Sequence, residues 1–332
     1  MTATSSSVGL LAFLLLIAPA QVSIQQPALP QQQQPSEPGY AVRANVERVN
    51  VDAAVSDSHG QFIVGLKRDQ FHVFDNGAEQ PILDFAPIDA PARVLLIVET
   101  SPAVYMLSDE HQAAALRLLD GLSPTDYVAL GIYSDSFRPV LGFTQDKGAA
   151  ARALAQLQFG LGFAQLNLFG SLSSAIDDVL ATPMPDASAG GKTAIVLLST
   201  GLSDVQTEQA RGHVSSQLQV SGIAVYTIAL GGNLRSPGTK TAGGQAAAQA
   251  FQQADTDLRA IAESSGGLAF FPKTGKDLAG AYTEVAQTLR HLYSLAIAPP
   301  VHDGKVHALR VDVGDTGRDL RILSRPAYLA PN

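Results

Sequence analysis

The chain has 332 residues, of which 46% are hydrophobic, so it can bury a substantial core and is too apolar for wholesale disorder. Its formal net charge of −8 argues against nucleic acid or an anionic membrane surface as the main partner. The absence of cysteine excludes disulfides, thiolate nucleophiles, Cys-ligated zinc and a lipid anchor on an acylated cysteine.

Residues 1–20 have the pattern of an export signal. They carry no charged side chain, the segment 8–17 is apolar, and Ala18-Pro19-Ala20 has the small-x-small form of a signal-peptidase site. The apolar stretch is too short for an ordinary membrane-spanning helix, and no later segment is long and apolar enough for one. We therefore predict a cleaved signal peptide and a secreted or periplasmic, that is extracytoplasmic, protein. The alternatives are an uncleaved membrane anchor and a misassigned start.

A flexible linker and a small β segment are expected next. Residues 21–39 are rich in Gln, Pro and Ser, a composition that cannot repay the entropy of folding. In the N-terminal β segment, 40–90, apolar and polar residues alternate from Val42 to Val55, which predicts a strand with one buried face. Asn76-Gly77 is a strong hairpin signal. Further strands are expected over residues 61–64, 71–74 and 81–85.

From residue 91 to 292, strands alternate with helices. This order predicts crossover connections and a doubly wound, mostly parallel sheet of the Rossmann-like α/β class. The unbroken apolar run from Val94 to Val98 indicates a strand covered on both faces. The expected strands are 93–99, 127–133, 193–199, 223–230 and 268–271, with 137–143 as an antiparallel edge strand. The expected helices are 108–122, 147–158, 168–180, 207–220, 251–264 and 276–292, and a mobile loop is expected over 231–249.

Strand-like alternation of apolar and polar residues occurs again in the C-terminal β segment, 293–332. Strands are expected over residues 293–299, 306–313 and 319–325, and they alternate as the early strands do. We expect the two β segments to pack together as one antiparallel module, a β-sandwich, with the α/β domain inserted between them.

The order of these elements resembles a von Willebrand factor A (VWA) domain. The stretches Val51–Phe85, Tyr293–Val313 and Ser324–Leu329 resemble, more narrowly, the VWFA-related family of acidobacterial secreted proteins. The resemblance covers nearly everything from Val42 to Tyr328. It implies a metal-ion-dependent adhesion site, in which a first loop Asp-x-Ser-x-Ser, a Thr and an Asp hold a divalent cation, usually Mg²⁺, through hard oxygens.

This sequence departs from that set of ligands. In the first loop, Glu99 stands where the Asp is expected, Ser101 matches and Ala103 replaces the second Ser. In the third loop, Thr200 stands where the Asp is expected. Because Mg²⁺ tolerates poor geometry badly, we expect no cofactor, although the remaining oxygens could hold a divalent cation, Mg²⁺ or Ca²⁺, weakly.

The second loop supplies no obvious ligand either, since Leu166 or Gly170 stands where the Thr belongs. We therefore predict a degenerate adhesion site, with no metal-ligating residues, that binds a protein partner. Its residues are Glu99, Ser101, Ala103, Leu166, Gly170, Thr200 and Asp204.

The resemblance favours a secreted, non-enzymatic protein-interaction module with no catalytic residues. We expect an unidentified protein partner in the envelope or outside the cell, bound through residues 100–104, 165–170 and 201–204. The alternative is an extracytoplasmic α/β hydrolase or small-molecule-binding protein that uses the same strand-end crevice, with Ser101 as its candidate nucleophile. A purely structural envelope component is a third reading.

His302-Asp303 and His307 invite a metal hypothesis, but their spacing fits no common His-metal motif. Asp303-Gly304 is typical of a hairpin turn. We therefore expect a turn there and place His307 on a surface strand.

Overall fold

The computed structural model describes residues 48–86, 90–160, 165–183, 192–205, 207–232, 235, 242–314, 317 and 319–332. These residues belong to one compact unit, Val46–Asn332. The predicted signal peptide and linker lie outside the described residues. Within the described part of the chain, no helix combines the length and the apolar character needed to cross a membrane.

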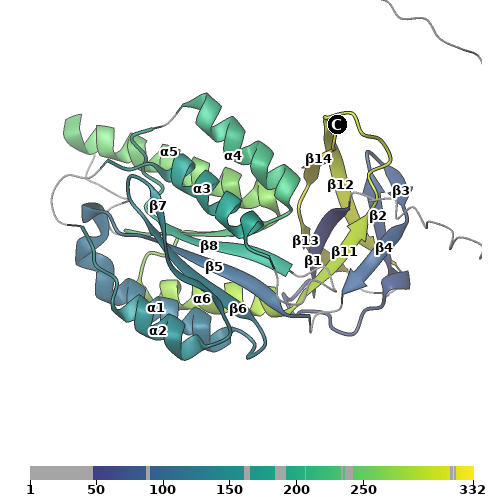
Figure 1. Ribbon diagram of the computed structural model, residues 1–332, viewed down its shortest axis with the longest axis horizontal. Coiled ribbons are helices and arrows are strands. Elements are labelled where there is room, and N and C mark those ends of the chain that lie inside the picture. The colour runs from purple at the N-terminus through teal and green to yellow at the C-terminus, as the bar shows by residue number, and fades with distance from the viewer. Residues whose placement is uncertain are drawn as a thin grey trace, which may run out of the picture. The chain divides into compact units, whose positions relative to one another are not determined.

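A six-stranded sheet forms the centre of the α/β region (Figure 1). Its strands are β5 (Ala92–Glu99), β6 (Tyr127–Tyr133), β7 (Phe137–Thr144), β8 (Lys192–Ser199), β9 (Ala224–Ala229) and β10 (Ala269–Phe270). They lie in the order β10-β9-β8-β5-β6-β7, and every neighbouring pair is parallel except β6 with β7. The predicted fold class, including the antiparallel edge strand, is confirmed.

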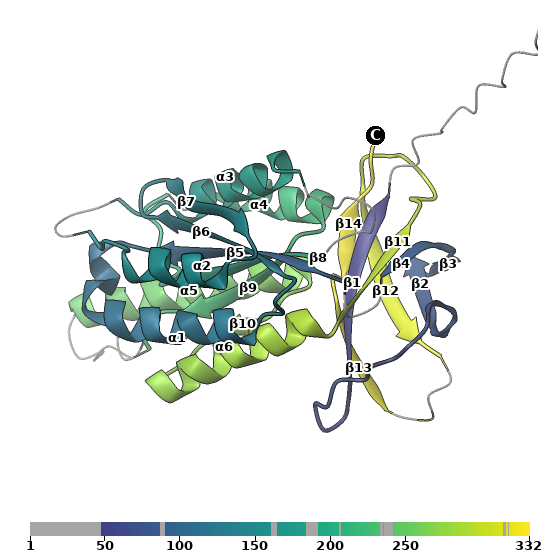
Figure 2. The same cartoon turned by 60° about the horizontal axis from the view of Figure 1, so that its bottom comes forward.

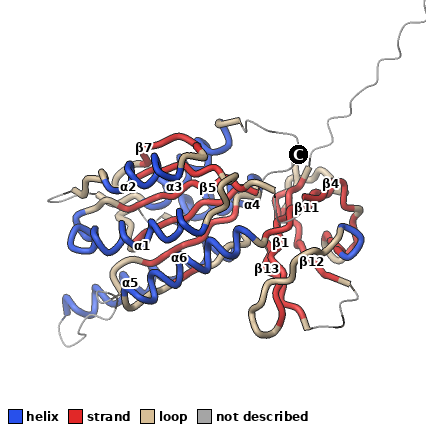
Figure 3. Tube along the Cα trace, turned by 90° about the horizontal axis from the view of Figure 1, so that it is seen from below, coloured by secondary structure: helices blue, strands red, loops and turns tan. Residues whose placement is uncertain are grey.

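Helices cover both faces of this sheet. The α-helices are α1 (Ser108–Gly121), α2 (Lys147–Ala155), α3 (Leu168–Ala181), α4 (Glu208–Ser221), α5 (Ala242–Ser265) and α6 (Gly275–Arg290), and short 3₁₀ helices span η1 (Arg68–Gln70) and η2 (Pro102–Leu107). Buried residues of α1, α2 and α6 share one core cluster, and those of α3, α4 and α5 share another. Figure 3 shows α1 and α6 running side by side on the first of these faces.

The central strand β5 shows why the sheet is covered twice. All eight of its residues are buried. Val94, Leu96 and Val98 pack in the α1–α2–α6 core, whereas Leu95 and Ile97 pack in the α3–α4–α5 core. Successive side chains of a strand point to opposite faces, so a continuous apolar run supplies both cores at once.

The two terminal β segments are interleaved in two four-stranded antiparallel sheets. The first has the order β13-β1-β11-β4 and the second β14-β12-β2-β3. Figure 2 shows β1, from the N-terminal segment, between two C-terminal strands. The strands are β1 (Val49–Asp57), β2 (Phe71–Asp75), β3 (Ala78–Gln80), β4 (Ile82–Ala86), β11 (Leu292–Ile297), β12 (Val306–Val313), β13 (Leu320–Ser324) and β14 (Ala327–Leu329).

A shared core holds these two sheets together. Val51 on β1 and Tyr293 on β11 belong to the same buried cluster as Val73 on β2 and Val311 on β12. Alternate residues of β1 and of β11 face this core, as the alternation in the sequence predicts. We call this two-sheet unit the β module.

The structure corrects two local predictions and confirms a third. The expected mobile loop over 231–249 is wrong in its second half, because α5 begins at Ala242; Ala and Gln are good helix formers. In place of a strand over 61–64, the structure has one isolated bridge between Ser56 and Phe62. The hairpin at Asn76-Gly77 is confirmed: both residues have positive φ, 47° and 86°, and they join β2 to β3.

Candidate functional site

The carboxyl ends of β5 and β8 form the centre of the candidate site. From β5 the chain crosses through α1 to β6 on one side, and β8 pairs with β5 on the other side. In a doubly wound sheet, ligands bind at such a switch point, outside the carboxyl ends of the strands. Glu99 ends β5 and Ser199 ends β8, so the fold brings their side chains to this place.

Glu99 accepts hydrogen bonds on both of its carboxylate oxygens. Its Oε1 atom accepts from Ser101 Oγ at 2.6 Å and from Thr200 Oγ1 at 3.1 Å. Its Oε2 atom accepts from Thr200 N at 2.6 Å, Tyr133 OH at 3.1 Å and Ser199 Oγ at 3.3 Å. None of these five residues is more than 1% exposed. We call this group the Glu99 cage.

The cage joins three neighbouring strands at their carboxyl ends. The Tyr133 hydroxyl, from β6, lies 2.5 Å from Ser199 Oγ, from β8, and Ser199 Oγ also accepts from Gly201 N at 2.7 Å. Burial, together with the nearby charge of Glu99, raises the pKa of Tyr133 well above its ordinary value. Tyr133 therefore stays a neutral O–H donor at physiological pH.

Arg235, in the segment that follows β9, brings a positive charge to the cage. Its Nη2 atom donates to the carbonyl oxygen of Thr200 at 2.5 Å, and its Nε atom donates to that of Leu230 at 3.1 Å. Its Nη1 atom pairs with the carboxylate of Asp255, and the Arg235 side chain is 9% exposed. Burial lowers the pKa of Arg235 to about 10, against the opposing effect of Glu99, so the guanidinium remains charged at neutral pH.

This arrangement does not fit a divalent cation. A Mg²⁺ site needs several hard oxygens with free lone pairs directed at one point. The Glu99 oxygens already accept from four side-chain hydroxyls and a backbone amide, and the Thr200 hydroxyl, which donates to Glu99, also accepts from Leu202 N at 3.2 Å. Across the described residues, no cluster of three or more His, Asp or Glu side chains could hold a metal ion.

The remaining predicted site residues lie elsewhere on the same rim. Leu166 N donates to Asp204 Oδ2 at 2.7 Å, and Asp204 N donates to the Leu166 carbonyl at 2.7 Å, so these two loops are tied to each other. Gly170 lies in the first turn of α3 and donates its N–H to the capping residue Asn167 at 3.0 Å. Ala103 lies in η2, and its side chain is outside the described part.

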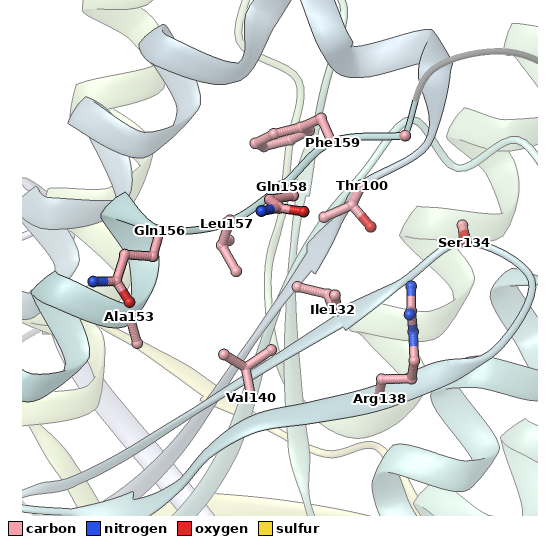
Figure 4. Close-up of a pocket in the computed structure, with 11 residues that line it drawn as sticks. Thr100, Ile132, Ser134, Arg138, Val140, Ala153, Gln156, Leu157, Gln158 and Phe159 are labelled. Carbon is pink, nitrogen blue, oxygen red and sulfur yellow. The ribbon is translucent and has the colours of Figure 1, made fainter.

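An open pocket of about 570 Å³ lies beside the cage on the same rim. Its walls come from the ends of β5 and β6, the beginning of β7, and α2 with the segment after it, where Gly160 N donates to the Thr100 carbonyl at 2.8 Å. The guanidinium end of Arg138 points toward the side where Thr100 and Ser134 lie (Figure 4). The lining residues are Thr100, Ile132, Ser134, Arg138, Val140, Ala153, Gln156, Leu157, Gln158, Phe159 and Gly160.

The prediction that His307 lies on a surface strand is wrong. His307 is 4% exposed; its Nδ1 atom lies 2.8 Å from Asp75 Oδ1 and its Nε2 atom lies 3.2 Å from Asp303 Oδ1. Tyr328 OH donates to Asp75 Oδ2 at 2.6 Å. The pairing of β12 with β2 and β14 turns this side of β12 inward, which strand alternation alone could not show. We call these four residues the His307 cluster.

Sequence reasoning missed Tyr133, Ser199 and Arg235. Tyr133 and Ser199 are the last residues of two predicted parallel strands, so aligning the strand ends beside Glu99 could have found them. Arg235 offers no such signal, because it ends no predicted strand and its position beside Thr200 depends on the tertiary fold.

No family model and no curated protein matches the chain. Solved structures to which it is similar include von Willebrand factor type A domains. One is the von Willebrand factor type A protein from Catenulispora acidiphila, with 11% identity over 87% of this chain and 76% of that chain, and a TM-score of 0.46.

A second is the von Willebrand factor domain of the type V pili tip protein Mfa5 from Porphyromonas gingivalis, with 14% identity over 60% of this chain and 95% of that chain, and a TM-score of 0.43. A third is an aerotolerance-related membrane protein from Bacteroides fragilis, with 16% identity over 59% of this chain and 98% of that chain, and a TM-score of 0.45. The narrower resemblance to acidobacterial secreted proteins stays a prediction.

Proposed function

We propose that the chain is an extracytoplasmic, non-enzymatic protein-interaction module of the VWA type with a degenerate adhesion site. Its protein partner binds at the carboxyl rim of the central sheet. The observation that carries the proposal is the pocket of about 570 Å³, which is open at this rim while the neighbouring Glu99 cage is buried. A partner therefore contacts the pocket and the surrounding loops, and not the Glu99 carboxylate.

The pocket offers a mixed surface of the kind that proteins recognise. Ile132, Leu157 and Phe159 give apolar area, Val140 is 43% exposed, and Arg138 adds a positive charge. Within the described part of the chain, no hydrogen bond or ion pair engages the Arg138 side chain. Apolar area with a few polar groups and an arginine is typical of the energetically important part of an interface.

A photo-crosslinking residue at Val140, in the full chain within its own cells, tests the proposed surface. The matched control replaces Val220 on α4, which is 62% exposed and lies away from the pocket lining. We expect a protein adduct from position 140 that is absent from position 220 and weakened by Arg138→Glu. Equal adducts from both positions, or none from either, would contradict the proposed surface.

Export is the part of the proposal that rests on the sequence of residues 1–20. We expect the mature chain, recovered from the extracytoplasmic fraction, to begin at Gln21. N-terminal sequencing checks this. A chain recovered only from the cytoplasm with Met1 intact would refute export.

No specific observation favours the hydrolase alternative. Ser101 is 1% exposed, so it is not accessible to a substrate, and among the described side chains its Oγ donates to Glu99 and is hydrogen-bonded to no histidine base. Turnover of ester or phosphate reporters that disappears in Ser101→Ala would overturn the non-enzymatic assignment.

A further inference from the structure

The contacts of Arg235 suggest which group supplies positive charge at this rim in place of a metal ion. The VWA-type site proposed above would normally place a divalent cation beside the carboxylate that ends β5. Here that carboxylate belongs to Glu99, which accepts from the Thr200 N–H, and the Arg235 guanidinium donates to the carbonyl of the same Thr200. We propose that Arg235 takes the electrostatic place of the cation, so that this rim is assembled without a metal ion.

The anchoring of Arg235 is the first support. Three of its nitrogens are engaged by the Thr200 carbonyl, the Leu230 carbonyl and the Asp255 carboxylate. An arginine presents its N–H groups in a planar fork and stays charged when buried, whereas a lysine is a single flexible point charge. The fork therefore ties the end of β8 and the end of β9 to α5.

The position of Thr200 is the second support. Its backbone N–H and hydroxyl hold Glu99, while its carbonyl holds Arg235. Thr200 is also the residue that stands where the resemblance expects a metal-binding Asp. The same residue thus connects the buried negative charge to the buried positive charge. A buried carboxylate needs such compensation, because an unpaired charge in the interior is strongly unfavourable.

Two aromatic rings fix the guanidinium further. Its Cζ atom lies 5.2 Å from the Phe251 ring centre on α5 and 5.9 Å from the Phe271 ring centre after β10. Both distances are within the range of a cation–π interaction. The positive charge beside the cage is thus held in place by two carbonyls, a carboxylate and these two rings.

The test measures thermal unfolding of the full chain in EDTA and in millimolar Mg²⁺, Ca²⁺ or Mn²⁺. We expect the wild-type midpoint to be the same in all four conditions. Arg235→Ala should lower the midpoint by roughly 5–10 °C, because it leaves Glu99 and Asp255 without their cation. Arg235→Lys, which keeps the charge but loses the fork, should give a smaller decrease and serves if Arg235→Ala does not fold.

Arg259→Ala is the matched control. Arg259 lies on α5 and, like Arg235, has its guanidinium over the Phe271 ring, at 4.3 Å, but among the described residues it makes no hydrogen bond to Thr200. Its removal should lower the midpoint less than that of Arg235. The proposal is overturned if Arg235→Ala is no more destabilising than Arg259→Ala. It is also overturned if calorimetry finds saturable metal binding to the wild type that Glu99→Gln abolishes.

This inference rests on the proposed VWA-type site, but its test needs no partner. Failure to find an adduct at Val140 would refute the proposed surface and leave the unfolding result intact. Conversely, a metal-dependent midpoint would refute the role of Arg235 and leave the crosslinking result intact.

Discussion

The Glu99 cage and the His307 cluster bury a carboxylate in two different ways. In the β module, Asp75 lies directly against the His307 ring at 2.8 Å. In the α/β region, Glu99 is surrounded by hydroxyls and an amide, and its positive partner Arg235 is bonded to the carbonyl of Thr200. The β module thus pairs its acid in direct contact, whereas the α/β region compensates its acid through an intervening residue.

The difference shows what each arrangement is suited to. A direct pair inside a two-sheet core locks β2, β12 and β14 together. In the Glu99 cage, neutral donors at the switch point keep the carboxylate buried. The neighbouring pocket is then the open part of the rim. Hydrogen bonds to buried charged groups contribute more to stability than bonds between neutral groups. Both arrangements therefore stabilise the fold only when every donor to the carboxylate is present.

The largest expected effect is that of Glu99→Ala. It removes the one acceptor shared by four side chains, so buried hydroxyls and the Thr200 amide lose their partner. We expect a loss of about 3–5 kcal/mol in the free energy of unfolding, measured by urea titration. Glu99→Gln, which keeps one acceptor oxygen, should lose less. Equal losses for both variants would show that volume, and not hydrogen bonding, dominates at this position.

His307→Phe tests the direct pair. It keeps an aromatic ring but removes the ring nitrogen that lies 2.8 Å from Asp75, so that Asp75 retains the Tyr328 hydroxyl as its donor and loses its contact with His307. We expect a loss of about 2–4 kcal/mol by the same titration. His59 lies in an exposed turn, so the control His59→Phe should change the free energy of unfolding little. A His307 variant as stable as the control would mean that the cluster does not stabilise the β module.

Asp52 is a third acid in the fold, and it differs from Glu99 and Asp75 because one of its carboxyl oxygens accepts no hydrogen bond from the described residues. It lies on β1, and its buried Oδ1 atom has no hydrogen-bond partner among the described residues. Burial raises its pKa from 3.8 to about 6, although Ser294, Lys192 and Arg325 oppose the shift.

Because the folded state prefers protonated Asp52, the wild type should gain stability as pH falls from about 6 to about 4. This gain is at most about 3 kcal/mol, and Asp52→Asn should lack it. The difference in unfolding free energy between the two proteins, measured from pH 4 to pH 7, checks this. The exposed control Asp69→Asn should follow the wild type. A difference that does not change with pH would contradict the raised pKa.

The smallest expected effect comes from comparing two buried tyrosines, one whose hydroxyl donates a hydrogen bond to Glu99 and one whose hydroxyl has no partner among the described residues. Tyr133→Phe removes one of several donors to Glu99 and should cost about 1 kcal/mol. Tyr282 is also fully buried, but its hydroxyl has no hydrogen-bond partner among the described residues. Tyr282→Phe should therefore be neutral or slightly stabilising. Equal losses in chemical unfolding would indicate that the cage does not depend on Tyr133.

Much of the fold could be predicted because its signals are local. The run from Val94 to Val98 and the strand–helix alternation indicated a doubly covered parallel sheet, and Asn76-Gly77 indicated a hairpin. The start of α5 at Ala242 was missed because a segment rich in Gly, Ala and Gln resembles a loop, although Ala and Gln favour a helix once tertiary packing supports it.

The candidate site could be predicted only in part. Sequence alone placed Glu99, Ser101 and Thr200 at strand ends, since loop position follows from strand position. It could not show that all three meet on one carboxylate, because that depends on the register between β5 and β8. Nor could it show Arg235 beside them.

By itself, the sequence determined the hydrophobic period of each segment, the chain positions of the rim loops and the residue types that those loops carry. Only the tertiary structure decided which charges face each other. Hydrophobic periodicity is read from neighbours along the chain, whereas the partners of a buried charge come from distant segments: Thr200 is 101 positions from Glu99, and His307 is 232 from Asp75. Packing, and not periodicity, brings such groups within hydrogen-bonding distance.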